Sequence, residues 1–258
     1  MTDSQAPLPP SAVAPPERRG LRRGVSLLPS LFTLANLFCG WSCVVYAMRG
    51  ELTTAAPFIG VAIVLDMLDG RIARLTGTSS DFGVQLDSLA DLISFGMAPA
   101  VLAYAWGLAP LGRLGWATGF LFVTAAALRL ARFNIQAHTD KRYFVGMPSP
   151  AAAAVPAATV FYYPVGLLSR GEAVVGLFVL LLPALLMVST IRFRSFKTFD
   201  LRMRRNYTVL IAFAAFLALI VTYPHEILLL MAYTYLASGL IGLFLQRVRP
   251  RTTDTPAA

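Results

Sequence analysis

Charged residues are scarce in this sequence, at 14% of its 258 positions, whereas hydrophobic residues make up 57%. The mean hydropathy is +0.65. Ordinary soluble domains carry about 25% charged residues. The scarcity of charge, together with long apolar runs, excludes a soluble globular protein and indicates a polytopic membrane protein.

Cysteine and histidine are also rare, with two residues of each. Cys39 and Cys43 lie one helical turn apart in an apolar run, so we expect burial in a helix interface and no disulfide. His138 and His225 fall in predicted loops on opposite sides of the membrane, which excludes a metal site built from both. The first 25 residues lack a secretory signal with a cleavage site, so the N-terminus is expected to stay in place.

Eight apolar runs predict about eight transmembrane helices in one all-α integral membrane domain over residues 25–246. The runs cover residues 28–48, 54–75, 84–106, 114–136, 151–168, 173–191, 207–223 and 226–246. The run at 151–168 is the weakest, because it is short and contains two prolines. Residues 1–24 are predicted to form a disordered basic tail, and residues 247–258 a flexible C-terminal tail.

The basic residues recur between the apolar runs, although the formal net charge is +9. This distribution favours membrane topology and anionic lipid headgroups over a nucleic-acid partner. With the N-terminus inside, all basic residues except Arg49, Arg113 and Arg170 fall at or near the cytoplasmic side. An even number of spans, with both termini cytoplasmic, is therefore predicted.

Four carboxylates lie within runs that otherwise resemble membrane-spanning helix. Asp66 and Asp69 are spaced i,i+3, and Asp87 and Asp91 are spaced i,i+4, so each pair occupies one helix face. A carboxylate at bilayer depth is costly unless cations, water or substrate meet it. We therefore predict that the two helices are adjacent and antiparallel, and that two divalent cations, Mg²⁺ or Mn²⁺, hold the cluster together.

The neighbours of these carboxylates favour a phosphate ligand. Gly70 allows close approach to the helix backbone, Ala73 keeps the next turn small, and Gly83 clears room on the second helix. Arg74 offers a fork of donors suited to phosphate oxygens, and Ser80 adds a hydroxyl in the intervening loop.

Eight fixed positions over 26 residues make up the full pattern: Asp66-x2-Asp69-Gly70-x2-Ala73-Arg74-x8-Gly83-x3-Asp87-x3-Asp91. This pattern resembles the complete signature of the CDP-alcohol phosphotransferases. The resemblance implies a membrane enzyme with a six-helix core, here followed by two more helices, in which an alcohol displaces CMP from a CDP-linked lipid.

The resemblance also implies roles for individual residues. Asp66, Asp69 and Asp87 would be metal ligands, and Asp91 would be both the general base and a ligand of the second metal. The positions that match CDP-contacting residues of the family are Gly70, Arg74 and Ser80.

Three further stretches resemble bacterial and archaeal phosphatidylserine synthases within this family, namely residues 28–40, 131–134 and 146–153. The resemblance implies transfer of the phosphatidyl group from CDP-diacylglycerol to L-serine by a homodimer. The distribution of basic residues predicts that the active site faces the cytoplasm, at the cell membrane. Glycerol 3-phosphate, inositol phosphate and choline are the alternative acceptors. An ion-coupled transporter is a further alternative, which the lack of an inverted repeat disfavours.

The first span carries three polar residues, Ser30, Thr33 and Asn36. The family often has Asn where this chain has Ser30, which puts a nucleotide contact there in doubt. Thr33 and Asn36 are polar groups within an apolar run, and both contact with the CDP-lipid and interhelical hydrogen bonding account for them.

The carboxylate of serine requires a fixed cation near the metals. Arg132 is the first candidate and Arg129 the second, although both also fit a role as anchors on the cytoplasmic side. Asn134 is a candidate contact of the serine ammonium, or a helix cap. Residues 148–150, Pro-Ser-Pro, are expected to turn the chain into the next span beside the site.

Overall fold

The computed structural model describes residues 19–76, 81–136, 144–167, 169–189, 192–193 and 207–248. These residues are almost entirely helical, which confirms the all-α class. In chain order the elements are α1 (Arg19–Met48), α2 (Leu52–Thr76), α3 (Asp81–Asp91), η1 (Leu92–Met97), α4 (Ala98–Ala103), η2 (Tyr104–Leu108), η3 (Ala109–Leu111), α5 (Arg113–Gln136), β1 (Phe144–Val145), α6 (Ser149–Tyr162), α7 (Arg170–Val188), β2 (Arg192–Phe193), α8 (Tyr207–Thr222) and α9 (Pro224–Val248).

Six helical segments among the described residues are long and apolar enough to cross a membrane: α1, α2, the continuous run from α3 to η3, α5, α7 and α9. The chain is therefore a multi-pass membrane protein. Two of the eight predicted spans correspond to shorter helices, since α6 has 14 residues and α8 has 16. At about 1.5 Å per residue the helical part of each is shorter than the roughly 30 Å of a hydrocarbon core, so a crossing at either place would need residues beyond the helix. The count of eight spans thus stays a prediction.

The N-terminal boundary differs from the prediction of a disordered tail over residues 1–24. Helix α1 already begins at Arg19, so residues 19–24 belong to it. Extending an existing helix adds one hydrogen bond for each residue fixed, and Arg and Leu are good helix formers. Residues 1–18 and 249–258 lie outside the described residues.

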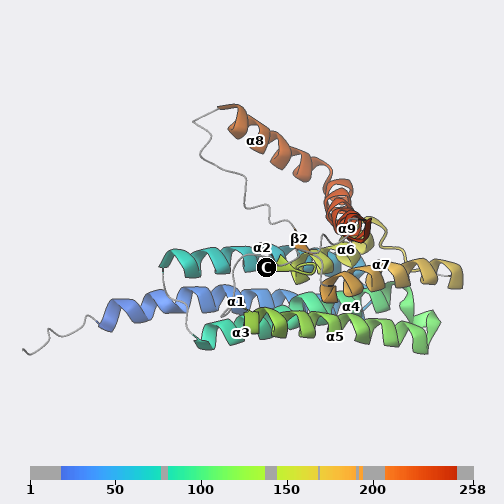
Figure 1. Cartoon of the computed structure of the whole chain (residues 1–258), viewed down its shortest axis with the longest axis horizontal. Coiled ribbons are helices and arrows are strands. Elements are labelled where there is room, and N and C mark those ends of the chain that lie inside the picture. Colours follow the sequence, from blue (N-terminus) through green and yellow to red (C-terminus); the bar gives the residue numbers. More distant parts are fainter. Residues whose placement is uncertain are drawn as a thin grey trace, which may run out of the picture.

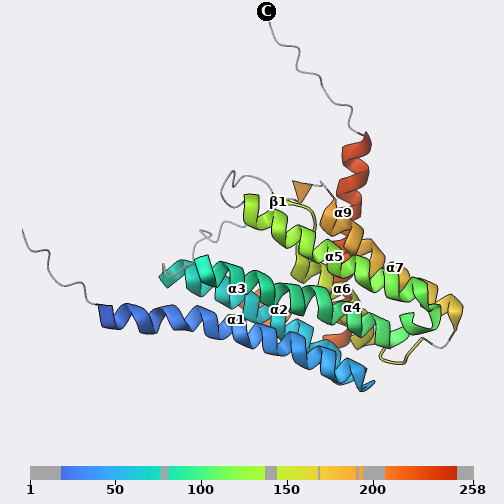
Figure 2. The ribbon, with the colours of Figure 1, turned by 90° about the horizontal axis from the view of Figure 1, so that it is seen from below.

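The short helix α6 lies at the centre of the packing. It contacts α2, α4, α7 and α9, while α1 packs against α2 and α3, and α5 packs against α7 (Figures 1 and 2). Most of α6 is buried, and its buried residues are mainly alanine and valine. Small side chains let neighbouring helix backbones approach closely in a membrane protein. Helix α8 stands away from the bundle and contacts α9 (Figure 1).

A two-stranded clip fixes the entry into α6. Strand β1 pairs antiparallel with β2, and the backbone N–H of Met147 donates to the carbonyl of Leu186 at 3.0 Å. Gly146, which lies between β1 and Met147, has a φ of +88°. A Cβ at this position would lie 2.5 Å from the carbonyl oxygen of Met187. Only glycine suits such a position. The clip sets Ser149, the first residue of α6, beside α5.

A π-helix, η1, continues α3 directly after Asp91. Single π-helical turns are frequent at functional sites. Helix α1 crosses η1 in close contact, because a Cβ added to Gly40 would lie 2.5 Å from Ser94 Oγ and 2.7 Å from Ser94 Cα. This crossing brings the polar residues of α1 level with the end of α3.

Candidate active site

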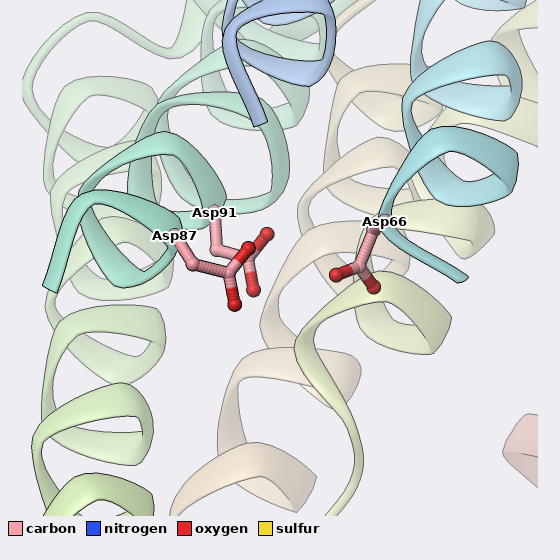
Figure 3. A group of neighbouring side chains, drawn as sticks. All are labelled: Asp66, Asp87 and Asp91. Carbon is pink, nitrogen blue, oxygen red and sulfur yellow. The ribbon is translucent and has the colours of Figure 1, made fainter. Parts of the chain in front are cut away.

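Three of the four predicted carboxylates converge between α2 and α3. Asp87 and Asp91 project from one face of α3 toward Asp66 on α2 (Figure 3). One oxygen of each lies within 4.8 Å of an oxygen of the other two. The i,i+4 spacing on α3 places Asp87 and Asp91 on one face, as predicted. The predicted direct packing of α2 against α3 is not seen among the described residues, because α1 packs against both helices and the carboxylates meet across the space beside it.

The donor set suits a hard divalent cation. All three groups offer carboxylate oxygens, which Mg²⁺ and Mn²⁺ prefer. Oxygens on opposite sides of a Mg²⁺ ion are about 4.2 Å apart, given a metal–oxygen distance of about 2.1 Å. A separation of 4.8 Å therefore needs only small side-chain shifts to hold such an ion. The residues present fit a metal centre.

Asp69, the fourth carboxylate, lies next to this group and has a different partner. It is 6% exposed, and Thr33 Oγ1 on α1 donates to its Oδ2 at 2.5 Å. Asp69 is close enough to Asp66 and Asp87 to repel both carboxylates. Four like charges thus gather where little water screens them, which makes cations beside them favourable.

Asp91 is held from α1 by Asn36. The Nδ2 of Asn36 donates to Asp91 Oδ1 at 3.1 Å, and Ser94 Oγ donates to the backbone carbonyl of Asn36 at 2.9 Å. Asn36 is 1% exposed, and its Oδ1 has no hydrogen-bond partner among the described residues. Ser94 was not predicted as a site residue, since a lone serine in an apolar run carries no signal of its own.

Arg129 is the basic residue that approaches the cluster. It lies near enough to Asp91 and Asp66 to attract both carboxylates, and its Nη1 donates to Ser149 Oγ at 2.8 Å. Its Nε is buried and has no hydrogen-bond partner among the described residues. Tyr235 of α9 also lies near the guanidinium. The prolines on either side of Ser149 predicted a turn there, but they did not predict the hydrogen bond between Ser149 and Arg129. No feature of the sequence indicated that Tyr235 lies near this site.

The other two candidates for the acceptor pocket are arranged differently. Asn134 donates to Ser88 Oγ at 2.9 Å, so it joins α5 to the residue after Asp87. Arg132 is half-buried, and no hydrogen bond joins it to a described residue.

The other residues predicted to contact the CDP-lipid lie on α1, on α2 and α3, or outside the described residues. Gly70 and Gly83 lie on α2 and α3, and Ser30 lies half-buried on α1. Ala73 and Arg74 are part of α2, but their side chains are outside the described set, as is all of Ser80.

The family model described as CDP-alcohol phosphatidyltransferase matches residues 26–191 of the chain. The chain belongs to this family. The matched segment contains all four carboxylates and Arg129, so the cluster of Figure 3 lies within the family's characteristic region.

Several curated relatives are similar over much of their length. A CDP-diacylglycerol–serine O-phosphatidyltransferase of Helicobacter pylori strain 26695 is 39% identical, covering 83% of this chain and 90% of the relative. An enzyme of the same name from Bacillus subtilis is 35% identical, covering 67% of this chain and 93% of the relative. An archaetidylserine synthase of Methanothermobacter thermautotrophicus is 34% identical, covering 64% and 69%. The chain is thus an enzyme of the CDP-alcohol phosphotransferase type.

Proposed function

We propose that this enzyme transfers the phosphatidyl group from CDP-diacylglycerol to the hydroxyl of L-serine, giving phosphatidylserine and CMP. The observation that carries the proposal is the convergence of Asp66, Asp87 and Asp91 within membrane-spanning helices of a CDP-alcohol phosphotransferase. The printed names of the relatives support serine as the acceptor.

Asp91 is proposed to be the general base. Its carboxylate accepts the proton of the serine hydroxyl as the oxygen attacks the phosphorus that carries diacylglycerol. A phosphorus–oxygen bond forms, the bond from that phosphorus to the bridging oxygen of the pyrophosphate breaks, and CMP departs with that oxygen. Nδ2 of Asn36 donates a hydrogen bond to this carboxylate.

Asp66, Asp69, Asp87 and Asp91 would hold two divalent cations, Mg²⁺ or Mn²⁺. When bound, such ions neutralise the carboxylates and stabilise charge on a pyrophosphate. Thr33 fixes Asp69 for this role. The proposed contacts of the CDP-lipid remain those predicted from the motif and from the first span: Gly70, Ala73, Arg74, Ser80, Gly83 and Ser30, with Thr33 and Asn36 beside them.

Arg129 is proposed to bind the carboxylate of serine. The support is its place beside Asp91, its hydrogen bond to Ser149, and an Nε that no described residue engages. These features favour Arg129 over Arg132. Asn134 is proposed to act through α3, since it bonds to Ser88.

The proposed setting is the cell membrane, with the site facing the cytoplasm. The basic residues between the apolar runs support this orientation and an attraction to anionic lipids. Eight spans over residues 25–246 and a homodimer complete the proposal.

The test is CMP release by the purified protein from CDP-diacylglycerol with Mg²⁺ or Mn²⁺. L-Serine is compared with glycerol 3-phosphate, inositol phosphate and choline, and the wild type with Asp91→Asn. Asp81→Asn is the matched control, because Asp81 lies exposed on the same helix outside the motif. We expect serine-dependent release that Asp91→Asn abolishes and Asp81→Asn leaves unchanged.

Each other outcome has a distinct meaning. Release with another acceptor alone would retain the phosphotransferase chemistry and reject serine. Full activity of Asp91→Asn would reject Asp91 as the base. The absence of release with every acceptor would reject the proposed reaction.

A further inference from the structure

Helix α1 presents two polar side chains, one turn apart, to two different carboxylates of the site. Thr33 donates to Asp69 at 2.5 Å, and Asn36 donates to Asp91 at 3.1 Å. Asp69 comes from α2, whereas Asp91 ends α3. A single helix therefore contacts one motif carboxylate from α2 and one from α3.

The position of α1 against η1 is fixed closely. Gly40 has no room for a Cβ against Ser94, and Ser94 Oγ donates to the Asn36 carbonyl at 2.9 Å. Asn36 is thus tied to η1 through its backbone and to Asp91 through its side chain. A shift of α1 along its axis would break both bonds, so the geometry of Asp91 depends on this contact.

Asn36 makes two opposing contributions to stability. Its Oδ1 is buried and unpartnered among the described residues, which is unfavourable, whereas its Nδ2 donates to the buried Asp91 carboxylate, which is favourable. An apolar side chain of the same branching would remove both contributions. Because the two largely offset each other, the bond to Asp91 fits a role in the chemistry better than a role in packing.

We propose that Asn36 is a positioning residue for Asp91, and that two residues of α1 have separate roles. Thr33 orients Asp69, a metal-binding carboxylate, and Asn36 orients the carboxylate that accepts the proton. Nδ2 of Asn36 engages Oδ1 of Asp91, which restricts the rotation of the carboxylate. This inference rests on the proposed function, in which Asp91 is the base.

The experiment compares Asn36→Leu with Thr33→Val in the full-length protein. Each variant keeps the branching of its side chain and removes its hydrogen-bond donor. Three quantities are measured: kcat for CMP release at saturating substrates and metal, the Mg²⁺ concentration for half-maximal activity, and the melting temperature. Ser42→Ala is the control, since Ser42 is another buried polar residue of α1.

For Asn36→Leu we expect kcat to fall about 10- to 150-fold, the range for losing one hydrogen bond to a charged group. The half-activating Mg²⁺ concentration and the KM for L-serine should change less than about 3-fold. The melting temperature should change little, because losing the bond to Asp91 and removing the buried, unpartnered Oδ1 have opposite effects on stability. For Thr33→Val we expect a rise of about 5- to 30-fold in the half-activating Mg²⁺ concentration, with kcat recovered at high Mg²⁺. Ser42→Ala should match the wild type.

If high Mg²⁺ restored the kcat of Asn36→Leu, the proposed separation of the roles of Asn36 and Thr33 would be wrong, because Asn36 would then act through metal binding. A fall in melting temperature that parallels the fall in kcat would indicate a structural role, and unchanged kcat would remove the role altogether. If Asn36→Leu does not accumulate, Asn36→Ala is judged by the same three quantities. A wild type that releases no CMP with serine would reject the proposed function, whereas an active wild type with an active Asn36→Leu would reject this inference alone.

Discussion

Replacing Arg129 with methionine is expected to lower kcat/KM for L-serine about 10- to 150-fold. Methionine keeps an unbranched side chain of similar length and removes the charge and all N–H donors. Arg129 Nη1 donates to Ser149 at 2.8 Å, and the buried Nε has no partner among the described residues. The N–H groups of Arg129 that Ser149 does not engage are therefore available to bind the carboxylate of L-serine.

The magnitude follows from one lost hydrogen bond between charged groups. Such a bond contributes about 1.5 to 3 kcal/mol, and about 1.4 kcal/mol corresponds to a factor of ten. The loss should concern the carboxylate of serine specifically. Ethanolamine is serine without that carboxylate, so its slow reaction should change less than about 3-fold in Arg129→Met.

The assay is CMP release with each of the two acceptors, for the wild type, Arg129→Met and the control Arg132→Met. The half-activating Mg²⁺ concentration is measured alongside. Arg129 lies near Asp66 and Asp91, so removing its positive charge should strengthen cation binding to these carboxylates. Loss of metal therefore should not explain the loss of activity with serine.

Two results would refute this reasoning. Equal losses with serine and ethanolamine would show that Arg129 does not recognise the carboxylate. A larger loss in Arg132→Met than in Arg129→Met would return the role to Arg132.

Three further predictions concern the metal and two glycines. Chelation with EDTA should abolish CMP release, and added Mg²⁺ or Mn²⁺ should restore it; activity that persists after chelation would contradict a metal centre at Asp66, Asp87 and Asp91. Gly40→Ala should destabilise the protein by about 1 to 3 kcal/mol, because its Cβ meets Ser94, whereas Gly60→Ala, with no atom within 4 Å, should be neutral in the same thermal melts. Gly146→Ala should also lower the melting temperature, because it combines a positive φ with a contact at 2.5 Å; an unchanged value would show that the clip relaxes.

The carboxylate cluster could be predicted from the sequence because helical periodicity alone sets its geometry. Asp87 and Asp91 share a face of α3 at i,i+4, and Asp66 and Asp69 lie at i,i+3 near the end of α2 that leads to α3. The sequence did not predict that α1 would pack against both helices. The apolar runs likewise predicted the helices. Polar residues are costly in a bilayer, so a long apolar run is a reliable sign of a membrane helix.

The surroundings of the cluster depend on contacts between distant segments, which the sequence alone does not determine. The preference for Arg129 over Arg132 arises from the clip that places Ser149 beside α5. Ser94 is a hydrogen-bond partner of Asn36 because α1 crosses the π-helix η1. The spacing of residues in the sequence does not predict this π-helix. The shortness of α6 follows from Tyr163, which leaves the helical conformation just before Pro164.

The central position of α6 has a consequence for protein engineering. The family match ends at residue 191, but Ala232 and Leu236 of α9 share a core with Val155 of α6. The boundary of similarity therefore does not coincide with the boundary of the packed unit. A chimera that takes its last helix from a relative would have to exchange α6 as well, because the two helices form one interlocking surface.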